Sequence, residues 1–251
     1  MTDAVHGTTS HAAGNRLRGR RIVITGAASG IGRCTAQLFA AQGAALTLLD
    51  RNAAGLSELA RETRGHAFEV DITDEASVAR AVEQGASAMG GIDGVVNAAG
   101  IMLRGSVLEV GVAQWRHVLE VNLTGTYIVV RCCLPWLTQA PFATIVNIGS
   151  GQALLPNAPD RTAYAASKGG VVNLTRALAA ELAPAIRVNS VCPGLVDTPM
   201  AEGVQGNFGN YALGRLAQPL EIANAILFLT SSESSYVTGA ALAVDGGRSF
   251  H

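Results

Sequence analysis

The sequence has only four cysteines, and their pattern is not that of a zinc site. They are Cys34, Cys132, Cys133 and Cys192, and no Cys-x-x-Cys or Cys/His pair occurs. We therefore expect no metal site and interpret the adjacent Cys132 and Cys133 as reduced, buried thiols that act as small hydrophobic side chains. Reduced thiols fit a cytoplasmic protein.

The sequence also lacks an excess of charge and a long apolar run. The net charge of the 251 residues is −1, with no basic block, so we expect neither nucleic acid nor an anionic membrane as a partner. No apolar run approaches the roughly 20 residues that span a bilayer. Residues 1–19 have no apolar centre typical of a secretory signal. We interpret residues 1–19 as a flexible N-terminal extension and 20–251 as one catalytic domain.

What the chain does have is an alternation of short apolar runs with segments of helical periodicity. This order predicts an α/β protein with a single-domain doubly wound parallel sheet, a Rossmann fold, of about seven strands with helices on both faces. Asp74 is the expected N-cap of the third helix. Strands are expected at 21–25, 45–49, 67–70, 93–96, 144–148, 187–191 and 241–244, and helices at 31–42, 53–63, 74–89, 112–137, 162–182 and 219–231.

A glycine-rich loop follows the first expected strand. Gly26, Gly30 and Gly32 lie in it, with Ser29 and Ile31 between them. Glycines turn the chain tightly and leave room for a phosphate near the backbone, and the N-terminus of the following helix supplies free N–H groups. The spacing differs from Gly-x-Gly-x-x-Gly but meets the same physical needs. The loop predicts a phosphate site for a cofactor, at the edge where such sheets bind ligands.

Asp50 ends the second strand, where an acid can bind both hydroxyls of an adenosine ribose. A 2′-phosphate would instead face a carboxylate, which costs about 4 kcal/mol at roughly 4 Å and an effective dielectric of about 20. The glycine loop carries Ser29 and no basic residue. These features predict NAD rather than NADP, although Arg51 could offset part of the repulsion if it turned inward.

The next two strand ends carry further candidates for cofactor contact. Asp71 could accept a hydrogen bond from the adenine amino group or could cap the following loop, and Ile72 could flank the adenine. After the fourth strand, small residues leave room for the cofactor, and Asn97 is expected to bond backbone groups across strands as support beside it. The candidate residues of this segment are Asn97, Ala98, Ala99 and Gly100.

Tyr164 and Lys168 are four residues apart in an expected helix, so their side chains lie on one face, one turn apart. A phenol titrates near pKa ~10 and is a poor base at neutral pH, but a nearby cation favours the phenolate. Lysine and an oxidised nicotinamide could together bring the tyrosine pKa close to physiological pH. The pair alone is weak evidence, because this spacing is common in helices.

The remaining motifs give the pair its context. Ser150 ends the fifth strand, Asn122 lies in the long helix, and Pro193-Gly194 follows the sixth strand. With the glycine loop, Asp50 and the Tyr/Lys pair, the chain from about residue 20 to 247 resembles the single-domain members of the short-chain dehydrogenase/reductase family. One departure is that the segment from Ser150 to Tyr164 is one residue longer than the commonest spacing. We expect the extra residue in the loop at 157–161, near the pocket mouth.

The resemblance implies a role for each residue. Tyr164 would be the general acid/base, Ser150 would hold the substrate oxygen, and Lys168 would lower the tyrosine pKa and bond the nicotinamide ribose. Asn122 would stabilise a water in a proton relay that reaches Lys168. The nicotinamide carboxamide would be held at Thr198 and the Val196 backbone, beside Pro193 and Gly194. The resemblance also implies a homotetramer paired through the helices at 112–137 and 162–182 and the last strand, with the alanines Ala177, Ala180 and Ala183 either at this contact or in the core.

The expected substrate pocket is mostly apolar with few fixed charges, so a phosphorylated or polyanionic substrate is not expected. The resemblance implies that the segment between 198 and 214 is the substrate lid, and because it is short and glycine-rich we expect a small, mobile lid. Substrate contacts are expected from Ser150, Gln152, Leu154, Met200 and Tyr211, with Met102, Leu103, Ala153 and Phe208 as further lining.

Three interpretations of function remain open at this point. The first is an NAD-dependent dehydrogenase of a small, largely uncharged secondary alcohol, polyol or hydroxy acid. The second is a carbonyl or 3-oxoacyl-carrier-protein reductase. The third is a non-catalytic dinucleotide-binding regulatory protein, which the intact set of Asn122, Ser150, Tyr164 and Lys168 disfavours.

Overall fold

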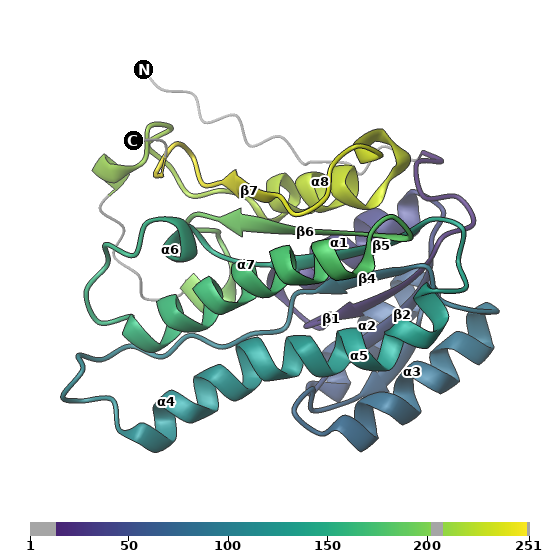
Figure 1. Ribbon diagram of the computed structural model, residues 1–251, viewed down its shortest axis with the longest axis horizontal. Coiled ribbons are helices and arrows are strands. Elements are labelled where there is room, and N and C mark those ends of the chain that lie inside the picture. Colours follow the sequence, from purple (N-terminus) through teal and green to yellow (C-terminus); the bar gives the residue numbers. More distant parts are fainter. Residues whose placement is uncertain (1–13, 202–207, 250–251) are drawn as a thin grey trace.

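The computed structural model describes residues 14–201 and 208–249, and these residues form one sheet of seven parallel strands (Figure 1). The strand order is β3-β2-β1-β4-β5-β6-β7, which confirms the predicted doubly wound fold. The strands are β1 (Arg21–Thr25), β2 (Ala45–Asp50), β3 (His66–Glu69), β4 (Gly94–Asn97), β5 (Ala143–Ile148), β6 (Ile186–Pro193) and β7 (Ala241–Val244).

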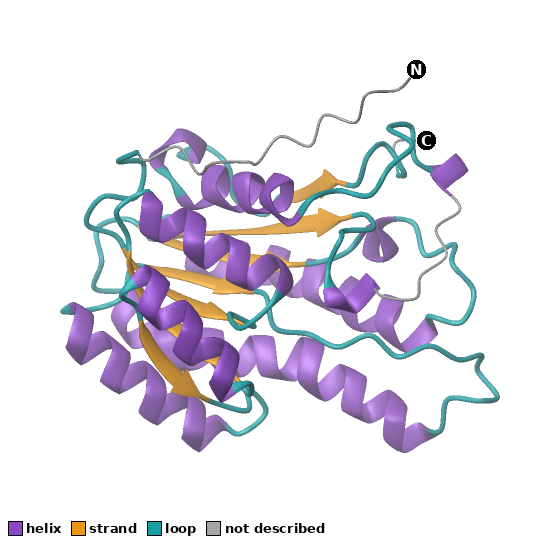
Figure 2. Ribbon diagram, turned by 180° about the vertical axis from the view of Figure 1, so that it is seen from behind, coloured by secondary structure: helices purple, strands orange, loops and turns teal. Residues whose placement is uncertain are grey.

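Helices cover both faces of the sheet, as Figures 1 and 2 show from opposite sides. A separate cluster of buried apolar side chains lies between each helical layer and the sheet. Because both faces are covered, β4 and β5 are buried at every position, which is why their sequences are nearly continuous apolar runs. One layer contains α1 (Gly30–Ala41), α2 (Ala53–Thr63) and α8 (Pro219–Thr230), and the other contains α3 (Glu75–Met89), α5 (Gly125–Leu137) and α7 (Thr162–Leu182), with α4 (Val112–Leu119) leading into α5.

The order of the strands reverses between β1 and β4. From β1 the chain winds outward through β2 to β3, and it then returns to place β4 on the other side of β1. Thr25 pairs with Asn97, and Asn97 pairs with Asn147, so β1, β4 and β5 end at the same level. The loops that follow these three strands therefore lie side by side, where a doubly wound sheet binds its ligand.

The predicted helix at 112–137 is not a single α-helix. Residues Glu120–Thr124 form a π-helical segment between α4 and α5. In this segment Asn122 is fully buried, and its carbonyl oxygen accepts a hydrogen bond from the Thr126 hydroxyl. Apolar periodicity continues through the segment, so the sequence pattern does not reveal the change in winding, which is frequent at functional sites.

Several short elements were also absent from the sequence-based expectation. They are the single-turn helix α6 (Gly151–Leu154) and the short helices η2 (Pro199–Ala201), η3 (Phe208–Asn210) and η4 (Ser232–Ser234). Segments of one turn are too short for a periodic signal. The expected N-cap of α3 is confirmed, because the Asp74 carboxylate accepts a hydrogen bond from the Ser77 N–H.

The described chain begins within the segment expected to be an N-terminal extension. Residues 1–13 lie outside the described residues, whereas residues 14–19 pack against the domain. Leu17 is fully buried, and its N–H donates to the Gln42 carbonyl. Arg16 forms an ion pair with Glu233 at 2.6 Å. The packed part of the chain therefore begins before the expected boundary at residue 20.

Candidate active site

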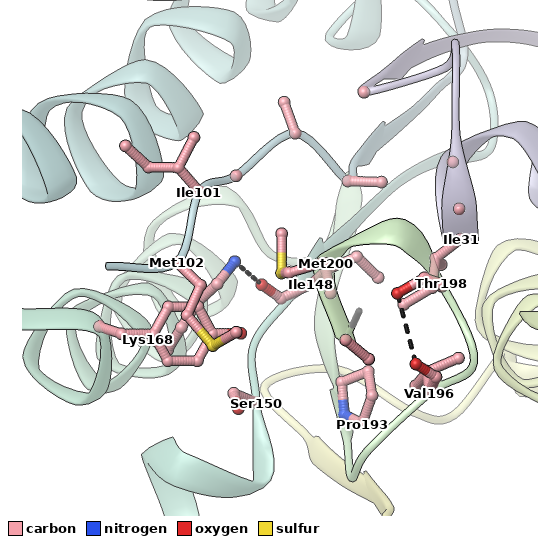
Figure 3. Close-up of a pocket in the computed structure, with 18 of the residues that line it drawn as sticks. Ile31, Ile101, Met102, Ile148, Ser150, Lys168, Pro193, Val196, Thr198 and Met200 are labelled. Carbon is pink, nitrogen blue, oxygen red and sulfur yellow. Dashed lines mark hydrogen bonds between the residues drawn. The ribbon is translucent and has the colours of Figure 1, made fainter. Parts of the chain in front are cut away.

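A cavity of about 330 Å³ lies across the carboxyl ends of the strands, and most of the predicted site residues line it (Figure 3). In Figure 3, Lys168, Ser150 and Met102 lie on one side of the cavity, and Ile31 and Thr198 lie on the other. Of the residues predicted to contact the substrate or cofactor or to act in catalysis, Asn97, Asn122 and Leu154 do not line it. The predicted residues that do are Gly26, Ser29, Gly30, Ile31, Gly32, Asp50, Arg51, Asp71, Ile72, Ala98, Ala99, Gly100, Ser150, Gln152, Tyr164, Lys168, Pro193, Gly194, Val196, Thr198, Met200 and Tyr211.

The three loop glycines are required for two different reasons. Gly26 has φ +66°, and a Cβ there would lie 2.7 Å from the Ala99 nitrogen. A Cβ at Gly32 would lie 2.1 Å from the Gly26 carbonyl oxygen, so these two glycines let the loop, the helix and the β4 end pack closely. Gly30 has φ +53°, and a Cβ there would lie 3.3 Å from the Thr198 methyl group, so these two residues adjoin at the cavity wall. Because Gly26 and Gly32 pack closely against the backbone, the N-terminus of α1 lies open at the cavity wall.

The carboxylate of Asp50 is held in place at the end of β2. Its oxygens accept hydrogen bonds from the Ala28 N–H at 3.0 Å and the Asn52 N–H at 2.9 Å. Arg51 does not turn toward it, because its guanidinium lies 3.7 Å from the Asp71 carboxylate instead. Asp50 therefore presents a fixed negative charge at this end of the cavity.

Asp71 forms the loop cap that was one of its two expected roles. One carboxylate oxygen accepts from both the backbone N–H and the hydroxyl of Thr73, at 3.0 and 2.7 Å. These hydrogen bonds, followed by the charge of Arg51, hold the pKa of the carboxyl below its usual value against the opposing effect of burial. Its other oxygen remains beside Arg51 at the cavity wall.

Asn97 and Asn122 support the site from behind its walls. The Asn97 amide donates to the Asn147 side chain at 2.8 Å, which links β4 to β5, so Asn97 supports its neighbours through a side-chain bond rather than through backbone groups. Asn122 holds Ile101 at both backbone groups, accepting from its N–H at 2.8 Å and donating to its carbonyl at 2.9 Å. It also donates to the Ser167 hydroxyl at 2.9 Å. Each asparagine lies too deep to contact the cavity directly.

The strand ends and α7 bring Ser150, Tyr164 and Lys168 together at the catalytic end of the cavity. Ser150 caps α6, and its hydroxyl oxygen accepts from the Gln152 N–H at 3.1 Å. Tyr164 and Lys168 project from one face of α7, with the ammonium 6.0 Å from the centre of the phenol ring. Lys168, the only lysine in the sequence, is buried and donates to the Ile148 carbonyl at 2.8 Å (Figure 3).

Burial has the largest effect on the charge states of this pair. Burial raises the pKa of the Tyr164 phenol above its usual value, while a hydrogen bond from Ser150 and the charge of Arg161 oppose that rise. Burial lowers the pKa of Lys168 to about 8. Lys168 was expected to lower the phenol pKa together with an oxidised nicotinamide, whereas the cation whose charge lowers the phenol pKa in this structure is Arg161.

Two arginines that were not among the predicted site residues line the same end of the cavity. Arg161 is the N-cap residue of α7, and Arg248 follows the last strand. Arg161 precedes Tyr164 by three residues, so helical spacing could have identified it. Arg248 lies far from the other motifs in sequence and carried no comparable signal. With these cations present, the expectation of few fixed charges in the pocket is wrong at this end.

The predicted substrate contacts are only partly brought together. Gln152, Met200 and Tyr211 line the cavity, together with Met102. Leu154 does not, because residues two positions apart on a helical turn point in different directions and Gln152 takes the cavity side of α6. Leu103 and Ala153 are also outside the lining, and the Phe208 side chain lies outside the described part of the structure.

Neither a metal site nor a membrane-spanning helix is found among the described residues. Among them, no group of histidine, cysteine, aspartate or glutamate side chains is arranged to hold a metal ion. Within the same part of the chain, no helix is both long and apolar enough to cross a membrane.

The cavity fits a nicotinamide dinucleotide at both ends. Gly30, at the N-terminus of α1, would give a phosphate access to the backbone, and Asp50 would offer acceptors to a ribose. At the catalytic end, a Cβ at Gly100 would lie 3.1 Å from the Asn122 side-chain oxygen and 3.3 Å from the Lys168 nitrogen. Glycine there leaves room beside the catalytic groups.

The chain is similar to known reductases and dehydrogenases over nearly its whole length. A family model described as enoyl-(acyl carrier protein) reductase matches residues 26–249. The 3-oxoacyl-[acyl-carrier-protein] reductase of Thermotoga maritima is 40% identical over 243 residues, which cover 92% of this chain and 98% of the relative. The cis-4-hydroxycyclohexanecarboxylate dehydrogenase of Sinomonas cyclohexanicum is 42% identical over 246 residues, with 93% and 98% covered.

A solved dehydrogenase structure is also similar to this chain over nearly its whole length. The aldohexose dehydrogenase of Thermoplasma acidophilum, in ligand-free form, superposes with a TM-score of 0.87 at 31% identity, covering 94% of this chain and 96% of that chain. A 3-alpha-(or 20-beta)-hydroxysteroid dehydrogenase of Mycobacterium tuberculosis is 37% identical over 240 residues, covering 92% of this chain and 90% of the relative. The chain belongs to the short-chain dehydrogenase/reductase family.

Proposed function

We propose that the protein is an NAD-dependent dehydrogenase that moves a hydride between nicotinamide and the carbinol or carbonyl carbon of a small secondary alcohol, polyol or hydroxy acid. The observation that carries this proposal is the convergence of Ser150, Tyr164 and Lys168 in one cavity with the glycine loop and Asp50. Similarity to dehydrogenases of hydroxycyclohexanecarboxylates and hydroxysteroids supports the same class of substrate.

Each catalytic side chain has a task in this proposal. Ser150 holds the substrate oxygen by a hydrogen bond, and Tyr164 takes the proton from the alcohol or returns it to the carbonyl. Lys168 holds the nicotinamide ribose from its fixed position at the Ile148 carbonyl. The cofactor, when bound, supplies or accepts the hydride. Asn122 orients Ile101 and Ser167 and thereby shapes a proton relay behind Lys168.

The expected test of this mechanism is the Tyr164→Phe variant. It should fold and bind NADH, but kcat should fall by about 10²–10⁴ because the general acid/base is lost. NADH absorbance would be followed with the two 4-hydroxycyclohexanecarboxylate isomers, an aldohexose and a hydroxysteroid as alcohols. Tyr236→Phe, at a fully exposed tyrosine, is the matched control. Turnover near the wild-type rate in Tyr164→Phe would exclude the assignment.

The preference for NAD rests on the fixed charge of Asp50. A 2′-phosphate roughly 4 Å from this carboxylate would be repelled by about 4 kcal/mol. Each ~1.4 kcal/mol of repulsion lowers the binding constant tenfold. We expect kcat/KM with NAD to exceed that with NADP by more than about 100-fold. Asp50→Asn keeps the shape but removes the charge, and it should lower this ratio by about tenfold or more. Asp74→Asn, at the N-cap of α3, is the control that should leave the ratio unchanged.

A second candidate is a reductase of 3-oxoacyl thioesters. The matching family model and the Thermotoga maritima relative carry this class of activity in their names. Reduction of an acetoacetyl thioester with NADPH, faster than any alcohol is oxidised with NAD, would favour this candidate. A protein that binds NADH but turns over neither kind of substrate would instead fit a non-catalytic dinucleotide-binding role.

We also propose a cytoplasmic homotetramer, paired through α5, α7 and β7. Ala177 and Ala180 of α7, and Ala183 directly after the helix, support this assembly, because they are exposed on the single chain and do not belong to its core. Small exposed side chains allow helices of two subunits to pack closely.

A further inference from the structure

Arg161 is a cation at the catalytic end of the cavity that the proposed reaction does not use. It lies at the start of α7, three residues before Tyr164, and its side chain is only 14% exposed. It lies close enough to the phenol for its charge to act on it. An arginine in such a place needs a partner, because an uncompensated buried charge is costly.

The described residues do not supply that partner in full. The Arg161 Nε atom is buried and has no hydrogen-bond acceptor. The nearest carboxylate oxygen, on Asp160, is 3.9 Å away, which is beyond hydrogen-bond distance, and that side chain is 44% exposed. Arg248 differs, because it donates to the Leu155 carbonyl and the Asn157 side chain and so holds the loop before α7. Arg161 is therefore the arginine that remains available to a ligand.

A second buried polar atom without a partner lies in the same cavity. The Gln152 side-chain oxygen has no hydrogen-bond donor, although Gln152 is only 6% exposed. Buried polar atoms of folded proteins are nearly always paired, so two unpaired groups in one cavity point to a polar ligand that pairs with them. Gln152 can serve a hydroxyl of that ligand.

The charges that line the cavity show the sign of this ligand. Its carboxylates, Asp50 and Asp71, follow β2 and β3 at the end away from the catalytic groups, and both are bonded to nearby backbone. The side chains described at the catalytic end include Arg161, Lys168 and Arg248 and no carboxylate. Asp160 lies 3.9 Å from Arg161 but outside the lining, and an end of a cavity whose charged lining side chains are all cations favours an anion there.

We propose that the substrate is a hydroxy acid whose carboxylate is held by the Arg161 guanidinium, with its carbinol at Ser150 and Tyr164. This inference rests on the proposed dehydrogenase function and makes its substrate class more specific. Guanidinium and carboxylate match as a two-point hydrogen-bonded pair, which fixes the distance from the carboxylate to the reacting carbon. In the reaction the carbinol carbon gives a hydride to NAD⁺ and the hydroxyl gives its proton to Tyr164, while the carboxylate is unchanged.

The test compares 4-hydroxycyclohexanecarboxylate with its methyl ester as substrates of the NAD-bound enzyme. We expect kcat/KM of the wild type to favour the acid by about tenfold or more, the range of a hydrogen-bonded ion pair. Arg161→Gln should remove most of this preference, mainly through KM of the acid, and Arg161→Lys should keep part of it. Arg80→Gln, at an exposed arginine of α3, should leave the preference at the wild-type value.

Each outcome separates the inference from the proposed function. Equal kcat/KM for acid and ester in the wild type overturns the carboxylate anchor but leaves the dehydrogenase intact. An effect of Arg161→Gln that is the same for acid and ester shows that Arg161 acts only on the phenol, and this also overturns the anchor.

If no alcohol is oxidised, the proposed function fails, and the anchor is tested by calorimetric titration of cyclohexanecarboxylate and cyclohexanecarboxamide into the NADH complex. Binding of the acid that is lost in Arg161→Gln supports the anchor, and equal or absent binding refutes it.

Discussion

At the scale of single residues, the one lysine of the chain lies in the site, at a position where an arginine would stay charged in any environment. Every other side chain among the 18 lysines and arginines of the chain is an arginine. A guanidinium stays charged in any environment, whereas an ammonium changes its pKa readily when it is buried. Burial lowers the pKa of Lys168 to about 8, so its charge can respond to the cofactor and to pH within the working range.

Lys168→Met should stabilise the cofactor-free protein at pH 7 while abolishing activity. The drop in lysine pKa from 10.5 to about 8 corresponds to a folding penalty of about 3 kcal/mol below pH 8. Loss of the donor to the Ile148 carbonyl offsets part of the gain, so we expect an increase of about 1–3 kcal/mol in the free energy of unfolding. The unfolded state binds more protons between pH 8 and 10.5, so the penalty shrinks over this range and the advantage of the variant should disappear near pH 10.5.

Urea denaturation of both proteins at pH 7 and pH 10 measures this change. Because the chain has a single lysine, the ¹⁵Nζ resonance of lysine-labelled protein is also unique and gives the pKa directly. A measured pKa near the ordinary value for lysine, or a variant that is less stable at pH 7, would contradict the prediction.

Site residues that belong to a local motif could be predicted from the sequence, whereas residues that the fold brings to the cavity from a distant position could not. Asp50 could be identified because it ends a strand, and Tyr164 and Lys168 because they share a helix face. Arg248 comes to the cavity only because β7 lies beside β6, which no local pattern reveals. Leu154 was assigned wrongly to the pocket because the single turn of α6, which directs it away, has no periodic signal of its own.

At the scale of elements, the glycine loop is a packing device as much as a binding loop. Gly26 lies at the crossing of the β1 and β4 ends, where backbone contacts leave no room for a side chain. The positions of the strands and long helices follow from apolar periodicity, and they agree with the structure closely. The π-helical segment in the middle of the predicted 112–137 helix does not follow from apolar periodicity, and it contains Asn122, which bonds Ile101 and Ser167.

Gly26→Ala should destabilise the protein and weaken NADH binding. Its φ of +66° disfavours alanine, and the new Cβ would lie 2.7 Å from the Ala99 nitrogen and 2.8 Å from the Ala98 carbonyl carbon. Strain and overlap together predict a loss of about 2–4 kcal/mol in the free energy of unfolding, measured by denaturation. Gly111→Ala is the control, since its φ is −66° and the added Cβ would meet only the Gln114 side chain at 3.7 Å. Equal stabilities of the two variants would refute this explanation of the loop.

At the scale of the whole molecule, the two helical layers differ in what they leave at the surface. The layer of α3, α5 and α7 carries exposed small residues along α7 and exposed apolar residues nearby, such as Tyr127 on α5 and Val112 on α4. Small and apolar side chains on one layer favour contact with another protein surface over contact with water. These exposed side chains support association of subunits through α5 and α7.

Gel filtration with light scattering should therefore give a particle near four times 25.8 kDa, about 103 kDa. Ala177→Arg places a long charged side chain on the exposed face of α7, and it should shift the mass toward dimer or monomer without a loss of helical structure by circular dichroism. Ala88→Arg makes the same change on the exposed surface of α3 and should leave the mass unchanged. A wild-type protein that elutes as a 25.8 kDa monomer would rule out the tetramer, and an Ala177→Arg variant that stays near 103 kDa would move the contact away from α7.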